Sequence, residues 1–163
     1  MTIRFDVAGR PAPKGSARAF VIPGQNRAVV APSGSPQNKA ALRSWDQAVR
    51  FAANEAVRGS TSPKFIDVPI RVAIDFRLAR PAGHWGKNGL KPSAPPYPSK
   101  KPDLDKLTRA TADSLKGTLY DDDSRIVALV VTKIYASPGN EGATIRVEAA
   151  AGTPGKLEEE TGR

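Results

Sequence analysis

The chain has 163 residues, of which 39% are apolar and 25% are charged, with no cysteine and a single histidine. This balance predicts one folded domain and excludes disulfides, thiolate metal sites and an imidazole-based zinc site, so any metal must be held by oxygen. A net charge of +9 favours an anionic partner such as nucleic acid. The N-terminus has no apolar signal segment and no stretch reaches the roughly 18 apolar residues of a membrane span, so we expect a cytoplasmic protein without membrane attachment.

The first third of the chain predicts a strand, a long connection and a helix. Apolar and polar residues alternate over 2–7, which is typical of a half-buried strand. Residues 8–37 are rich in proline, glycine and basic residues, and we expect loops with room for one hairpin. Helical spacing of apolar residues over 38–58 predicts an amphipathic helix, with Trp45 in the core rather than stacked on a base.

The remaining elements alternate between strand and helix patterns. Residues 68–78 have the cleanest strand alternation and predict a central strand, whereas 80–101 predict a long surface loop. A helix is expected over 104–116. The apolar segments 126–135 and 143–149, separated by a turn, predict a hairpin.

We therefore expect a single α/β (α+β) domain over residues 1–150, with a mixed sheet and two main helices packed on it. Residues 151–163 lack any apolar pattern, and we expect them to form a flexible tail without a functional role.

Charge is distributed unevenly along the chain. Residues 1–102 carry 17 Lys and Arg against 5 acids, or +12, whereas residues 103–126 carry 4 against 6, or −2. For a protein that approaches a polyanion, six carboxylates in a short window are unfavourable unless positive charge lies among them. A bound divalent cation would resolve this conflict.

The acidic window begins at a predicted helix start. Asp103 occupies a natural N-cap position after Pro102, and the helical pattern ends at Gly117. Asp103 and Asp105 would then lie at the positive end of the helix dipole. Asp121, Asp122 and Asp123 come directly before a strand, and a helix that turns back along the sheet could bring them to the same end.

Carboxylates gathered in this way fit Mg²⁺, which prefers hard oxygen ligands and commonly assists phosphodiester hydrolysis. The residues alone also allow a structural alternative. Asp103 would then be a plain N-cap, Asp105 and Asp113 would pair with Arg109, and the three consecutive aspartates would form a solvated turn.

Beyond these arguments, the segment resembles a known signature. Pro102-Asp103-Leu104-Asp105, Arg109, Asp113-x-Leu115 and Asp122-Asp123 are similar to the Asp-x-Asp-Asn-x-x-Lys and later Asp-Asp of the RusA family of Holliday junction resolvases. The resemblance implies a RusA-like homodimer that uses Mg²⁺ or Mn²⁺ to hydrolyse branched DNA, including four-way junctions, by paired cuts in recombination and repair. It also implies that Asp103, Asp105 and Asp123 bind the metal, with Asp122 as their neighbour.

Two positions depart from the family signature. Lys106 stands where the family has Asn, and Arg109 stands where it has Lys. Because Arg stays protonated, Arg109 can hold a phosphate or stabilise developing charge but cannot transfer a proton.

Basic residues outside the window are candidates for phosphate contacts, although a solvated basic loop explains each of them equally well. His84 and Trp85 could stack on an unpaired base or anchor their loop. Two other functions stay open, a catalytically inactive junction-binding protein and a generic basic nucleic-acid-binding module. The DNA-binding candidates are Lys14, Arg18, Lys87, Lys91, Lys100, Lys101 and Lys106.

Overall fold

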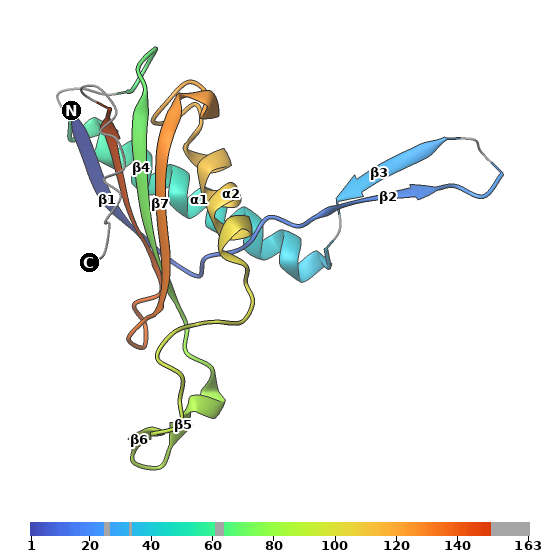
Figure 1. The fold of residues 1–163 in the computed structure, drawn as a ribbon, viewed down its shortest axis with the longest axis vertical. Helices are drawn as coiled ribbons and strands as arrows, with labels where there is room; N and C mark the ends of the chain where they lie inside the picture. The colour runs from blue at the N-terminus through green and yellow to red at the C-terminus, as the bar shows by residue number, and fades with distance from the viewer. Residues whose placement is uncertain (25–26, 33, 61–63, 151–163) are drawn as a thin grey trace, which may run out of the picture.

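A four-stranded sheet with two helices packed on it forms the body of the protein in the computed structural model, which describes residues 1–24, 27–32, 34–60 and 64–150 (Figure 1). Its strands stand in the order β1 (Thr2–Ala8), β8 (Gly142–Ala149), β4 (Ile70–Leu78) and β7 (Ile126–Tyr135). The β1–β8 and β8–β4 pairs are antiparallel, and the β4–β7 pair is parallel. This mixed α+β architecture confirms the expected fold class.

Helix α1 (Pro36–Arg58) covers the apolar face of the sheet. It begins at Ser35, whose hydroxyl oxygen accepts a hydrogen bond from the backbone N–H of Asn38 at 3.2 Å. Trp45 is 1% exposed and packs against the Phe76 ring on β4, with the ring centroids 6.5 Å apart. Trp45 is therefore a core residue, as its place on the apolar stripe indicated.

Helix α2 (Leu104–Leu115) lies beside α1 and carries the acidic window's first part. The indole Nε1 of Trp45 donates to Thr111 Oγ1 at 3.0 Å, and the Ser114 hydroxyl donates to Asp46 Oδ1 at 2.7 Å. Because these bonds join the two helices from the inside, they hold α2 in one position over the sheet. The predicted helix limits were correct to within one residue at the C-terminal end.

The expected hairpin between the last two strands is wrong, because β4 lies between β7 and β8. The turn after β7 crosses the end of β4, where Ala136 N–H donates to Leu78 O at 2.8 Å and Arg77 Nε donates to Asn140 O at 3.1 Å. The physical reason is burial. The alternate apolar side chains of β4 are buried, as suits a strand with a neighbour on each side, whereas the side chains of β7 are partly exposed, as suits a strand at the sheet edge.

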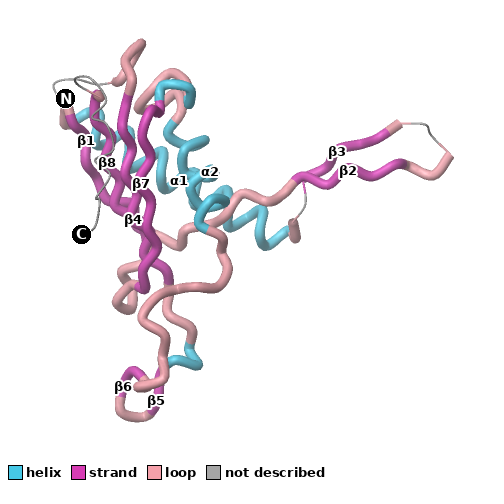
Figure 2. The backbone as a smooth tube through the Cα atoms, viewed as in Figure 1, coloured by secondary structure: helices cyan, strands magenta, loops and turns pink. Residues whose placement is uncertain are grey.

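Two segments extend away from the body (Figure 1, Figure 2). The first is the hairpin of β2 (Ala17–Val21) and β3 (Ala28–Pro32), which confirms the hairpin expected in the basic N-terminal connection. The second joins β4 to α2 and contains a 3₁₀ turn, Ala82–His84, and the short strands β5 (Trp85–Gly86) and β6 (Gly89–Leu90).

Residues 151–163, where a flexible tail was expected, lie outside the described residues. Within the described ranges, every helix is too short or too polar to cross a membrane.

Candidate metal centre and nucleic-acid cleft

The first two acidic side chains are presented at the start of α2. Asp103 has the extended backbone of an N-cap, with φ −69° and ψ 137°, but its side chain makes no capping hydrogen bond. Its carboxylate lies 3.5 Å from the Lys106 ammonium, and both side chains are nearly half exposed. Asp105, in the first helical turn, has no hydrogen bond or ion pair to any described residue. Asp105 is therefore unpaired among the described residues, and Asp103 has only the partly exposed Lys106 as its partner.

At the other end of α2, two of the three consecutive aspartates have structural partners. Asp121 pairs with Arg125 at 3.0 Å. Asp122 accepts from Lys116 Nζ at 2.7 Å and from the backbone N–H of Ser124 at 2.9 Å. The Lys116 ammonium and the Ser124 N–H hold the pKa of the Asp122 carboxyl far below its ordinary value. Asp122 is thus engaged in the turn that leads into β7.

Asp123 has no salt bridge to the described residues, but it lies close to the buried Tyr120. The Tyr120 hydroxyl donates to Ala112 O at 3.0 Å. Burial raises the pKa of Tyr120, and the negative charges of Asp123 and Asp113 raise it further. The tyrosine therefore stays neutral and packs the end of α2 against Asp123, which remains exposed.

The raised pKa of Tyr120 predicts a stability that decreases in alkaline solution. Above the ordinary tyrosine value of 10.0 the unfolded chain releases this proton, whereas the folded chain keeps it. The free energy of unfolding should therefore fall progressively as the pH rises above about 10. Urea titrations should show a smaller decrease for Tyr120→Phe, and equal slopes for the two proteins would contradict this account.

The two groups of aspartates do not meet within one chain. α2 has 12 residues, so its ends are separated by roughly 18 Å. Lys133 Nζ, near the end of β7, donates to Lys100 O and Pro102 O at 2.9 and 3.0 Å, whereas Asp123 precedes the start of that strand. Among the described residues, no three Asp, Glu or His side chains are grouped so that they could hold a metal. The expectation that a single chain gathers them is therefore wrong.

The ion pairs also differ from the structural alternative considered for the helix. Asp113 pairs with Lys14 of the first basic loop and not with Arg109. The Lys14 backbone N–H donates to Lys106 O at 3.1 Å, so this loop lies against α2. Arg109 is exposed and makes no hydrogen bond or ion pair to a described residue, which leaves its guanidinium available to a phosphate.

A cleft of about 1010 Å³ opens beside the start of α2. Asp103 is the one acid among its described lining residues, whereas four cations line it, namely Lys14, Lys39, Lys101 and Lys106. Lys39, on the first turn of α1, was not singled out from the sequence, although residues 7–45 contain no acid and six Lys or Arg. A concave surface of this charge fits a polyanion next to a metal.

The other DNA-binding candidates have different positions. Lys100 lines a neighbouring cleft, and Lys91 Nζ donates to Gly83 O at 2.9 Å within its own loop. Lys87 is exposed on that loop. Arg18 lies on β2, and its side chain is outside the part of the structure that is described.

Exposed carboxylates at a helix start beside a basic cleft are an arrangement that suits a cation and a nucleic-acid backbone. The family model of endodeoxyribonuclease RusA matches residues 20–148, so the chain belongs to this family of endodeoxyribonucleases, which act on branched DNA junctions. It is also similar to the uncharacterized protein YqaN of Bacillus subtilis (strain 168). The two are 27% identical over 137 residues, which are 80% of this chain and 96% of that protein.

Proposed function

We propose that this protein is a divalent-metal-dependent endonuclease that cuts branched DNA, with four-way junctions as substrates, and that it acts as a homodimer. The observation that carries the proposal is the pair of carboxylates at the start of α2. The Asp103 side chain makes no capping hydrogen bond, and the Asp105 side chain makes no hydrogen bond or ion pair to the described residues. They stand beside a basic cleft in a chain of an endodeoxyribonuclease family.

The donor set fits Mg²⁺, or Mn²⁺ as an alternative, because it offers exposed carboxylate oxygens and neither thiolate nor imidazole. Asp103 and Asp105 would hold the ion together with Asp123 of the partner subunit. When bound, such an ion would supply the positive charge that polarises a phosphate and lowers the pKa of a bound water. Arg109 and Lys106 hold and orient the phosphate by charge, and Lys14 and Lys101 position the DNA backbone in the cleft.

A homodimer is supported by the edge strand β7. Four of its residues are large, apolar and exposed by 42 to 65%, namely Val127, Leu129, Val130 and Ile134. The outer edge of β7 has no strand partner among the described residues. A long apolar edge of this kind favours pairing with another strand. An isologous contact between two copies would satisfy the unpaired backbone groups and cover the apolar side chains.

Antiparallel pairing of β7 with its copy would also complete the metal site. The start of one β7 would then lie beside the end of the other, which is where α2 of that other chain begins. Asp123 of the partner subunit would approach Asp103 and Asp105, which Asp123 of the same chain does not reach. The separation observed within one chain is thus expected if each site is shared between two chains.

Cleavage of a labelled four-way junction, compared with a linear duplex of the same sequence, tests this function. We expect the wild-type chain to cut the junction when Mg²⁺ is present, and Asp105→Asn to lower the rate on the order of a hundredfold or more. Asp6→Asn is the control, because this carboxylate is on β1, outside the cleft, and its side chain is 69% exposed.

Junction binding without any metal-dependent cleavage would instead indicate an inactive binding protein. Salt-sensitive binding of any DNA, with no preference for the junction and no effect of Asp105→Asn, would indicate a generic basic module.

A further inference from the structure

Residues 79–101, which we call the finger, connect β4 to α2 and extend beyond the sheet (Figure 1). The sequence from 76 to 102 contains no acid, and the finger itself carries five Lys or Arg. Three large apolar side chains on it are exposed, Trp85 by 40%, Leu90 by 47% and Tyr97 by 67%. Exposed aromatic rings among cations are typical of surfaces that bind unpaired nucleotides.

The base of the finger is fixed against the end of β7. The Arg80 guanidinium lies 4.0 Å from the centroid of the Tyr135 ring and donates to Pro95 O at 2.8 Å. The His84 ring meets Tyr135 edge-on, with centroids 5.6 Å apart and an interplanar angle of 89°. His84 thus anchors the loop. The base of the finger is therefore preorganised, which lowers the entropy lost when the exposed aromatic residues bind a ligand.

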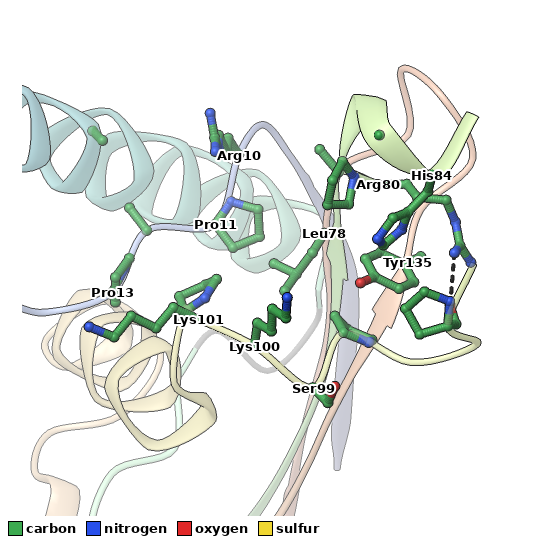
Figure 3. A pocket seen from close by; sticks show the side chains of 18 of the residues that line it. Arg10, Pro11, Pro13, Leu78, Arg80, His84, Ser99, Lys100, Lys101 and Tyr135 are labelled. Carbon is green, nitrogen blue, oxygen red and sulfur yellow. Dashed lines mark hydrogen bonds between the residues drawn. The ribbon is translucent and has the colours of Figure 1, made fainter. Parts of the chain in front are cut away.

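A second cleft, of about 1040 Å³, lies between the base of the finger and the connection after β1 (Figure 3). Its described lining contains Arg10, Arg80, Lys100 and Lys101 and no acid. The side chains of Arg10, Lys100 and Lys101 make no hydrogen bond or ion pair to the described residues. Such a set of unpaired cations in a concave site is suited to phosphate groups.

This cleft adjoins the cleft that contains Asp103. Lys101 and Pro102 line both this cleft and the one that contains Asp103. A DNA strand held at Asp103 can therefore continue into the second cleft and reach the finger without leaving a basic surface.

We propose that the finger and the second cleft bind the unpaired nucleotides next to the branch point. Arg10, Lys100 and Lys101 contact the phosphates, while Trp85 and Tyr97 stack on bases. Duplex DNA has the faces of its bases covered, so exposed aromatic rings add affinity only where bases are unpaired. The assignment of DNA as the ligand rests on the proposed function, whereas the preference for unpaired bases rests on the finger.

The two tryptophans provide a direct readout, because Trp45 is 1% exposed and Trp85 is 40% exposed. An oligothymidine of about 15 nucleotides, added in EDTA, should quench the emission of Trp85, and the quench should weaken with salt. Trp85→Phe should remove the quench and leave the emission of Trp45 unchanged. A duplex of equal length should quench much less.

Affinity for the oligothymidine, measured by fluorescence anisotropy of a labelled strand, should fall about tenfold in Trp85→Leu and in Tyr97→Leu. Phe51→Leu is the matched control, since Phe51 is an exposed aromatic residue on α1, 70% exposed and outside the finger. Because all three side chains are exposed, thermal unfolding should confirm that the variants stay folded.

Unchanged oligothymidine affinity in both finger variants would overturn the inference, as would equal quenching by duplex and single strand. These outcomes are distinct from a failure of the proposed function, because binding in EDTA needs no cleavage. If the chain cuts the junction normally in Mg²⁺ but fails the oligothymidine binding test, the inference about the finger is wrong and the proposed function stands. A finger that binds as expected on a chain that cuts no DNA would support the finger and reject the nuclease.

Discussion

A one-to-one mixture of Asp105→Asn and Asp123→Asn chains is expected to nick a four-way junction, although each variant alone should be nearly inactive. If each site takes Asp105 from one chain and Asp123 from the other, a mixed dimer has one doubly altered site and one intact site. Random assortment makes half of the dimers mixed, so about a quarter of the wild-type sites should return. The product should be nicked on one strand, because paired cuts need two sites.

The control mixture combines Asp103→Asn with Asp105→Asn. Both residues lie at the start of the same α2, so every site in the mixed dimer keeps one altered carboxylate and activity should not return. Chains with two different affinity tags allow the mixed dimers to be isolated before the junction assay. If purified mixed dimers of Asp105→Asn and Asp123→Asn stay inactive, the shared site is wrong.

Gly142→Ala is expected to cause a large loss of stability. Gly142 begins β8 with φ +154°, and an added Cβ would lie 1.9 Å from the carbonyl oxygen of Val7. That oxygen belongs to the backbone of β1, which pairs with β8 beside this position, so the clash cannot be relieved by a side-chain rotation. Urea unfolding should show a decrease in the free energy of unfolding of about 3 kcal/mol or more.

Gly139→Ala is the matched control for this substitution. Gly139 also has a positive φ, +78°, but an added Cβ would meet no atom within 4 Å. Its cost should be limited to the backbone conformation, about 1 kcal/mol. Equal destabilisation by the two substitutions would mean that β1 and β8 separate easily and that the contact does not limit stability.

Much of the fold was predictable because burial leaves a local pattern in the chain. The alternation of Ile70, Val72, Ile74, Phe76 and Leu78 predicted a central strand, and all five side chains are buried. The same reasoning placed Trp45 in the core. These inferences succeeded because each needs only the spacing of apolar residues along one element.

Strand neighbours were less predictable, because pairing depends on which edge each strand occupies. The short turn between β7 and β8 suggested a hairpin, but β4 separates them. Local spacing cannot reveal that β4, roughly 50 residues earlier in the chain, lies between the consecutive strands β7 and β8, since this contact is nonlocal.

At the candidate site, the sequence by itself determined the start of α2 and the presence of Asp103 and Asp105 there. A proline, a capping position and a helical repeat are all local signals. Only the tertiary structure decided where Asp123 lies relative to them. The rigid length of α2 keeps Asp123 at the opposite end, and the parallel β4–β7 pair fixes that direction.

The tertiary structure also decided which charges are free. Lys14 reaches Asp113, 99 residues away along the chain, and Lys116 binds Asp122, whereas Asp105 and Arg109 have no such partner among the described residues. A sequence lists these charges without saying which of them neutralise one another. Distances in the folded chain settle that question, because attraction between charges depends on separation in space.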